Sequence, residues 1–292
     1  MHSLRPLSSV PIFCTPEKSP ELKKAIILNS QFEIMKKLIL VSNDDGYMAK
    51  GVRELMAMLA PYGEVVAVCP DQGRSGQSMA LTFDAPLRVK EEKSPVEGAR
   101  LFSCNGTPVD CVKISCYSVL EGRVPDLVVA GINHGSNVAV NVVYSGTMGA
   151  VQEGCSWGVP AIGFSLTTHD PDADFMAVKP AVDALVPRIL KHGMPKGTFI
   201  NVNVPAEVED APLSLCRECK SHWSEEYKKY EDPMGHPFYM LSGHMINDEP
   251  SATDTDLYAL AHGRTSVVVE ALDRTAPATL MPDWIEFLRQ LD

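Results

Sequence analysis

The sequence predicts an α/β fold with a mostly parallel central sheet and helices on both faces. From Met35 onward, short apolar runs rich in β-branched residues alternate with segments whose apolar residues recur at helical spacing. Such alternation of strand and helix produces parallel sheets in which the crossover helices cover both faces. The pattern continues to Pro205 and then changes, because aromatic residues gather around Pro233-Met234-Gly235. Together these observations predict a Rossmann-like three-layer sandwich followed by a protruding β-hairpin.

The individual elements follow from the same periodicities. The expected strands are residues 37–42, 64–69, 125–131, 159–165, 198–205 and 265–270. The expected helices are residues 51–60, 107–120, 145–157, 177–192, 254–261 and 282–291. The second helix has the clearest start, with Thr107 as N-cap, Pro108 at the first position and Asp110 at the third. Residues 214–246 predict an extended hairpin, which cannot bury itself alone.

We divide the chain into a leader, residues 1–34, and a single α/β domain, residues 35–292. The domain has a core at residues 35–205, and residues 206–292 supply the hairpin and a C-terminal tail. The leader has four prolines before Lys23 and no cleavable hydrophobic segment, so it is not a secretory signal. Because Met35 directly precedes the first strand, we expect the leader to be disordered or to come from a non-native upstream start.

Composition limits the classes of partner. The formal net charge of −11 argues against a nucleic-acid polymer or an anionic membrane as the main partner. No apolar run approaches the ~18 residues needed to span a bilayer. Most of the eight cysteines lie in apolar surroundings, which is typical of a reducing compartment and predicts a cytoplasmic protein. Cys216-Arg-Glu-Cys219, with His222 close by, lacks the second ligand pair of a zinc site and is better explained as coincidence.

Asn43-Asp44-Asp45-Gly46 ends the first expected strand and is the strongest candidate site. In open α/β sheets, ligands bind at the carboxyl ends of the strands. Two adjacent carboxylates are costly to ionise together unless a cation lies between them, and a divalent metal ion is the simplest such cation. The alternative is an Asx turn closed by Gly46, since Asn, Asp and Gly dominate turns. These four residues alone leave both interpretations open.

Three further polar loops are expected at the same edge of the sheet: residues 70–78, 132–137 and 144–147. Their carboxylate, hydroxyl and amide oxygens suit Mg²⁺ or Mn²⁺ better than Zn²⁺, which favours Cys and His. Ser145-Gly146-Thr147 opens a helix, and small residues there can present backbone N–H groups to a phosphate. The alternative is that Ser145 or Thr147 only caps the helix.

The sequence leaves the roles of two other side chains in these loops undecided. Arg74 could pair with a phosphate through both guanidinium nitrogens. His134 could position a water or relay a proton, or it could be a solvated loop residue. A metal beside a phosphate cradle would make a phosphoester site.

At these residues the chain resembles the SurE (survival protein E) family of metal-dependent 5′/3′-nucleotidases. The resemblance runs from about residue 36 to 205, with weaker similarity to residue 270, and it rests on five ordered motifs. They are Asn43-Asp44-Asp45-Gly46; Pro70-Asp71 with Arg74-Ser75; Gly106-Thr107-Pro108 with Asp110-Cys111-Val112-Lys113; Gly131-Ile132-Asn133 with Gly135 and Asn137; and Ser145-Gly146-Thr147 with Glu153-Gly154.

The resemblance implies one divalent cation per subunit, Mg²⁺ or Mn²⁺. It also implies hydrolysis of nucleoside 5′- and 3′-monophosphates to nucleoside and phosphate, and some members cleave short polyphosphate. The metal ligands it implies are Asp44, Asp45, Ser75 and Asn133. Asp44, Asp45 and Asn133 are the implied catalytic residues, and Asn43, Ser145, Gly146 and Thr147 the implied substrate-binding residues.

The resemblance further implies that a C-terminal element is exchanged between subunits, giving a homodimer or homotetramer. The segment 214–246 and the separate C-terminal helix are similar to the parts that form these contacts in the family. The leader, residues 1–34, has no counterpart there.

Two rival functions make different demands on the sequence. A dehydrogenase on the same fold would need GxGxxG after the first strand, and residues 43–51 offer two glycines in the wrong places. A non-catalytic nucleotide- or metal-binding protein would have a degenerate site, whereas this chain keeps the full set of oxygen donors. Turnover with added metal would separate the enzyme from the binding protein.

Overall fold

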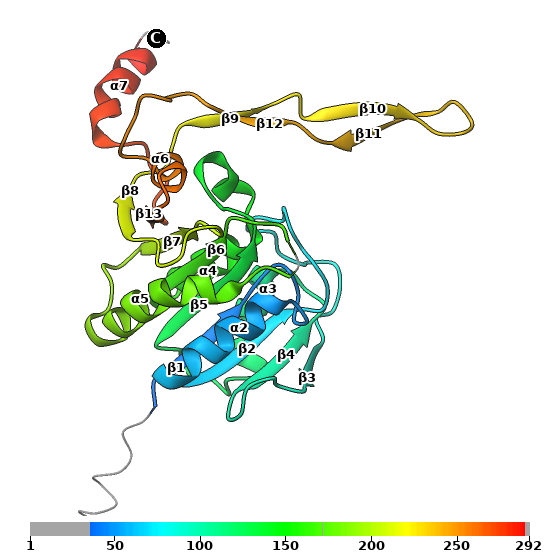
Figure 1. Ribbon diagram of the computed structural model, residues 1–292, viewed down its shortest axis with the longest axis vertical. Helices are drawn as coiled ribbons and strands as arrows, with labels where there is room; N and C mark the ends of the chain where they lie inside the picture. The colour runs from blue at the N-terminus through cyan, green and yellow to red at the C-terminus, as the bar shows by residue number, and fades with distance from the viewer. Residues whose placement is uncertain (1–35, 171, 290–292) are drawn as a thin grey trace, which may run out of the picture. The chain divides into compact units, whose positions relative to one another are not determined.

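A computed structural model describes residues 36–170 and 172–289, so the leader predicted for residues 1–34 lies outside the described residues. By its internal contacts the chain divides into residues 1–36 and residues 37–292. The helices and strands described below belong to the second unit (Figure 1).

The second unit is built on a nine-stranded sheet with the strand order β3-β4-β2-β1-β5-β6-β7-β13-β8. The six strands from β4 to β7 in this order run parallel. β3 is antiparallel to β4, and β13 is antiparallel to β7. The strands are β1 Leu38–Ser42, β2 Glu64–Pro70, β3 Val89–Glu92, β4 Arg100–Cys104, β5 Leu127–His134, β6 Ala161–Leu166, β7 Thr198–Val204, β8 Leu213–Cys216 and β13 Thr265–Ala271.

Helices cover both faces of the sheet, which makes three layers. Alternate residues of β1 divide between two cores: Ile39 and Val41 pack with α2 (Lys50–Leu59) and α5 (Lys179–His192). Leu38 and Leu40 point to the other face and pack with α3 (Pro108–Ser118) and α4 (Gly146–Ser156). This two-residue alternation is the expected pattern of a strand buried on both sides.

The connections place a topological switch point between β1 and β5. From β1 the chain moves outward through β2 and β4, and it then returns to build β5, β6 and β7 on the other side of β1. The loops that follow β1 and β5 therefore lead to helices on opposite faces of the sheet, and open α/β sheets bind ligands at such a point.

The hairpin predicted for residues 214–246 forms as two paired ribbons. β9 (Ser221–Ser224) pairs with β12 (His244–Asn247), and β10 (Tyr227–Glu231) pairs with β11 (Pro237–Leu241); both pairs are antiparallel and lie in line in Figure 1. Its base is fixed by Trp223, whose Nε1 donates to Asn141 Oδ1 at 2.9 Å. Asn141 lies in the 3₁₀ turn η2 (Ala139–Tyr144), which leads directly into Ser145.

The C-terminal region contains α6 (Asp256–Ala261), β13 and α7 (Met281–Arg289). β13 lies between β7 and β8, so residues of the tail complete the central sheet. No residue of α7 is buried, although Trp284, Ile285 and Leu288 are large and apolar and each is more than half exposed. Exchange of this region between subunits stays a prediction.

The structure confirms the predicted α/β fold with its mostly parallel sheet. The sequence pattern missed the short strands β3, β4 and β8, since β3 and β8 are edge strands with exposed residues and β4 contains Arg100 and Ser103. Among the described residues, no helix is both long and apolar enough to cross a membrane.

Candidate functional site

The predicted site loops meet at the switch-point edge of the sheet. Residues 43–46 follow β1, and Asn133 and His134 form the end of β5, which pairs directly with β1. The N-terminus of α4 packs against the first of these loops, because a Cβ added to Gly146 would lie 2.8 Å from Asp44 Cβ. Residues separated by about a hundred positions in the chain are therefore brought to one place by strand pairing.

Asp44 is the buried carboxylate of the site. Only 4% of the residue is exposed, and Thr147 Oγ1 donates a short hydrogen bond to its Oδ1. Burial raises the pKa of Asp44 to about 6, and the neighbouring Asp45 charge adds to this, while the hydrogen bonds from Thr147 oppose it. A cation beside this buried carboxylate would stabilise its ionised form.

Asp45 is held from the end of β5. The backbone N–H of His134 donates to Asp45 Oδ2 at 3.2 Å, and His134 Nδ1 lies 3.5 Å from the same oxygen. The two side chains are 18% and 19% exposed, so His134 is not the solvated loop residue that the sequence left as an alternative. Its ring also contacts Phe175 edge to face, with the ring centroids 4.7 Å apart.

Two asparagines flank the carboxylates. Asn43 is fully buried, and its Nδ2 donates to the carbonyl of Gly46 at 2.9 Å, which holds the two ends of this loop together. Asn133 is also buried, and its Nδ2 donates to the carbonyl of Gly135 at 2.9 Å. In both side chains one amide N–H is used on a backbone carbonyl, which leaves the amide oxygen for a cation and the second amide N–H for an anion.

Gly46 is required at its position for two reasons. Its φ of +97° lies in the region that favours glycine, and an added Cβ would come within 3.2 Å of the Gln72 backbone. The loop after β2 therefore packs closely on the Asn43–Gly46 turn. The Asx turn left open by the sequence does not form, because Asn43 Oδ1 has no hydrogen-bond partner, and the metal site stays a prediction.

The loop after β2 carries Arg74 and Ser75. The backbone N–H of Arg74 donates to the carbonyl of Asp44 at 2.6 Å, which fixes the loop beside the carboxylates. Arg74 Nη2 donates to the carbonyl of Asn105 at 3.0 Å. Ser75 is exposed, and within the described residues it has no hydrogen bond to Asp44, Asp45 or Asn133.

The small residues at the start of α4 have separate roles. Ser145 is the N-cap, with its Oγ accepting from the backbone N–H of Met148 at 3.0 Å. Gly146 lies against Asp44, where a Cβ would be 2.9 Å from Oδ2. Thr147 is fully buried and uses its hydroxyl on Asp44, a role that the sequence analysis did not foresee and that no local pattern signals.

The residues present fit a hard divalent cation. They offer two carboxylates, an amide oxygen and a hydroxyl in neighbouring loops, and no ion pair to Asp44 occurs among the described residues. Asn43 Oδ1 is buried there without a hydrogen-bond partner. The same edge holds further unpartnered buried polar atoms on Arg74, Gln77 and His134, as expected where a polar ligand binds.

Other polar residues of the sequence motifs are structural. Asn137 N–H donates to Asn203 Oδ1 at 2.7 Å, and its Nδ2 donates to Ser165 at 3.0 Å, so it ties the β5 loop to neighbouring strands. Thr107 and Asp110 form the predicted capping box. Cys216 and Cys219 hydrogen-bond to Ser214 and Asn247 respectively, and in residues 36–170 and 172–289 no three His, Cys, Asp or Glu side chains form a metal-binding group.

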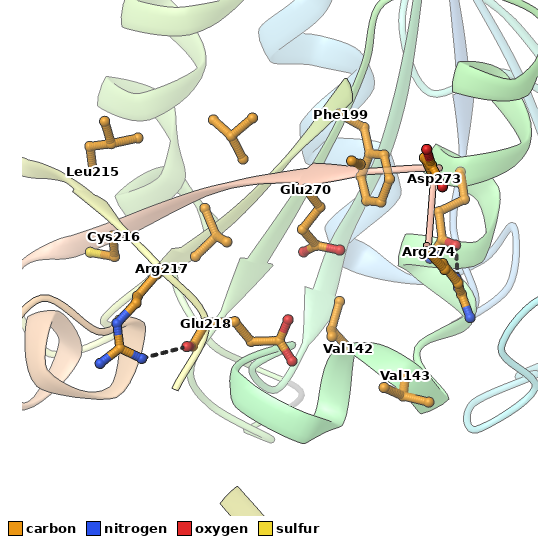
Figure 2. Close-up of a pocket in the computed structure, with 14 residues that line it drawn as sticks. Val142, Val143, Phe199, Leu215, Cys216, Arg217, Glu218, Glu270, Asp273 and Arg274 are labelled. Atoms are coloured by element: carbon orange, nitrogen blue, oxygen red, sulfur yellow. Dashed lines mark hydrogen bonds between the residues drawn. The ribbon is translucent and has the colours of Figure 1, made fainter. Parts of the chain in front are cut away.

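A separate cavity of about 640 Å³ lies beside β13 and β8 (Figure 2). Phe199, Val142 and Val268 are among its apolar lining residues, and Glu218 and Glu270 extend their carboxyl groups into the same space in Figure 2. Burial raises the pKa of Glu270 to about 7, with repulsion from Glu218 and Asp256 adding to it and a hydrogen bond from Asn201 opposing it.

The fold and the site define a Rossmann-like α/β protein with an acidic, oxygen-donor ligand site at its topological switch point. Residues 39–225 match the family described as survival protein SurE. A 5′-nucleotidase SurE of Bacteroides fragilis is 46% identical over 239 residues, which cover 82% of this chain and 93% of that protein. A 5′-nucleotidase SurE of Bacteroides thetaiotaomicron is 43% identical over 244 residues, which cover 84% of this chain and 93% of that protein. The chain belongs to the SurE family.

The structural comparison agrees with this assignment. The crystal structure of the SurE protein from Aquifex aeolicus matches with a TM-score of 0.72 and 32% identity, and it covers 86% of this chain and 99% of that chain.

Proposed function

We propose that this chain is a 5′-nucleotidase: a divalent-metal-dependent phosphomonoesterase that hydrolyses nucleoside 5′- and 3′-monophosphates to nucleoside and phosphate, and also cleaves short polyphosphate. The observation that carries the proposal is the adjacent carboxylates of buried Asp44 and partly buried Asp45, with Asp44 lying against the N-terminus of α4 at the switch point. The names of its relatives, 5′-nucleotidase SurE, support the 5′-monophosphate substrate. The metal, the 3′-activity and the polyphosphate activity belong to the proposal.

In this proposal one Mg²⁺ or Mn²⁺ per subunit is held by Asp44, Asp45, Ser75 and Asn133. When bound, the cation would supply Lewis-acid stabilisation of the charge on the phosphoryl oxygens. Asp44 is already oriented by Thr147, and Asp45 by His134. Ser75 would reach the ion from the loop that Arg74 fixes beside Asp44.

The phosphate would bind beside the cation, between the Asn43 turn and the start of α4. The helix N-terminus contributes a positive dipole end there, and Ser145 and Gly146 are small enough for close approach of the phosphate oxygens. Asn43 would contribute its amide, and Thr147 completes the surface by holding Asp44 at the helix start. One of the two aspartates, or His134, would relay a proton from the attacking water.

The proposal includes a homodimer or homotetramer and no nucleic-acid or membrane partner. The exposed apolar residues of α7 support an assembly in which this helix is covered by another subunit. The seven cysteines of the described residues are free thiols, which supports a reducing compartment such as the cytoplasm.

The experiment that tests the proposal is phosphate release from a panel of nucleoside 5′- and 3′-monophosphates and from tripolyphosphate. Each substrate is assayed with Mn²⁺, with Mg²⁺ and with EDTA, on the wild type and on Asp44→Asn. The matched control is Asp210→Asn, because Asp210 is exposed and has a φ of +50°, a conformation that Asn accepts readily.

Metal-dependent release that drops by at least about 100-fold in Asp44→Asn, and is unchanged in Asp210→Asn, is the expected result, since several kcal/mol of charge stabilisation depend on the ion. Circular dichroism would show that both variants are folded. Release that survives both EDTA and Asp44→Asn would place the chemistry elsewhere. No release with either metal would favour the binding-protein alternative.

A further inference from the structure

We infer that His134 is a positioning residue that aims Asp45 at the metal ion, and this rests on the proposed metal site. The side chain contacts Asp45 through Nδ1, which lies 3.5 Å from Oδ2, while the backbone N–H of the same residue donates to that oxygen at 3.2 Å. Two donors from one residue thus converge on Oδ2, so the other carboxylate oxygen is the one directed to a ligand. Residues that hydrogen-bond to a metal ligand in this way fix the orientation of the ligating side chain.

The tautomer of His134 follows from its surroundings. Its Nε2 is buried and has no hydrogen-bond partner among the described residues. A proton on Nε2 would turn the Nδ1 lone pair toward the Asp45 carboxylate, which is unfavourable. The ring therefore carries its proton on Nδ1, where it donates to Asp45.

The ring is also prevented from rotating away. Phe175, at the start of η3 (Phe175–Val178), contacts it edge to face and is itself fully buried in the core between the sheet and α2 and α5. Gly51 at the start of α2 lies next to Phe175, since an added Cβ would be 3.2 Å from the Phe175 ring. A hydrogen bond sets the direction of Asp45, and core packing holds the group that makes this bond.

Two substitutions separate the hydrogen bond from the packing. His134→Asn keeps an N–H donor close to the position of Nδ1 but loses the ring that contacts Phe175. His134→Phe keeps an aromatic ring against Phe175 but removes the donor. The backbone N–H to Asp45 remains in both, so any difference between them comes from the side chain.

The readout is Mn²⁺ affinity, measured by the electron paramagnetic resonance signal of free Mn²⁺ on the full chain without substrate. We expect His134→Phe to bind Mn²⁺ about tenfold more weakly or worse, the range found for lost outer-shell partners, while His134→Asn stays close to the wild type. Thermal unfolding should show the opposite order, with His134→Asn the less stable. The matched control is His169→Asn, because His169 lies at the same edge, with its ring against Gly135.

Equal Mn²⁺ affinity in the wild type and His134→Phe would overturn the inference. The inference would also be overturned if Mn²⁺ affinity were retained in His134→Phe and lost in His134→Asn. It would be overturned as well if the affinity fell by the same factor in His169→Asn. If the wild type did not bind Mn²⁺, the metal site itself would be wrong, and this inference would fall with it. In that case phosphate release in EDTA would still report on the phosphatase activity independently.

Discussion

Glu270→Gln is expected to stabilise the protein at neutral and alkaline pH. Glu270 lies on β13 and lines the cavity beside β8, where burial raises its pKa from the ordinary 4.5 to about 7. Its Oε1 accepts a hydrogen bond from Asn201 Nδ2 at 3.0 Å, which the amide oxygen of a glutamine can also accept. The substitution therefore removes a buried charge and keeps the hydrogen bond.

Proton linkage gives the direction in which ionisation of Glu270 changes the free energy of unfolding. The folded state holds the Glu270 proton more tightly than the unfolded chain, so this group disfavours folding once it ionises. Its contribution is most favourable below pH 4.5, falls as the pH rises from 4.5 toward 7, and is fully lost above about 7. Because each pKa unit corresponds to 1.36 kcal/mol, the loss at pH 8.5 is about 3 kcal/mol.

The assay is urea unfolding of the wild type and Glu270→Gln at pH 5, 7 and 8.5, at one protein concentration because assembly would change the apparent stability. The gain in free energy of unfolding for Glu270→Gln should grow with pH and level off near about 3 kcal/mol. Glu97→Gln, at an exposed position, is the control and should show no such growth. A gain that does not change with pH, or a loss of stability at pH 8.5, would refute the assignment of a buried carboxylate.

Three further predictions concern the site, its framework and the assembly. Gly146→Ala should lower phosphate release at least about tenfold while leaving the fold intact, because its Cβ would lie 2.8 Å from Asp44 Cβ and displace the carboxylate although alanine favours helix; unchanged turnover would contradict the proposed role of Asp44. Thr107→Ala should cost about 1–2 kcal/mol in urea unfolding, since Thr107 both caps α3 and donates to the Ala80 carbonyl at 2.7 Å; a cost near zero would show that the cap is not needed. Deletion of residues 273–292 should give a smaller species in size-exclusion chromatography with light scattering, because it removes the exposed apolar helix α7; an unchanged mass would rule out this helix as a subunit contact.

Much of the fold could be predicted because the relevant information is local. The short apolar run of β1 and the Thr107-Pro108-Asp110 start of α3 are encoded within a few positions, and both appear in the structure as predicted. The strand β4 was missed because Arg100 and Ser103 leave only a short apolar stretch in its sequence, and its burial comes from pairing with β2 and β3. The left-handed turn at Gly46 was likewise predictable from residue type, since few other residues accept its φ.

Some properties of the candidate site could likewise be predicted from the sequence, and others could not. The sequence by itself determined which residues are chemically able to hold a cation or a phosphate, because carboxylate, amide and hydroxyl groups carry that property wherever they lie. Only the tertiary structure decided that Thr147 holds Asp44, that His134 is packed beside Asp45, and that α7 stays exposed. The physical reason is that these contacts depend on which strands pair: β1 and β5 become neighbours through long-range pairing that the chain between them does not encode locally.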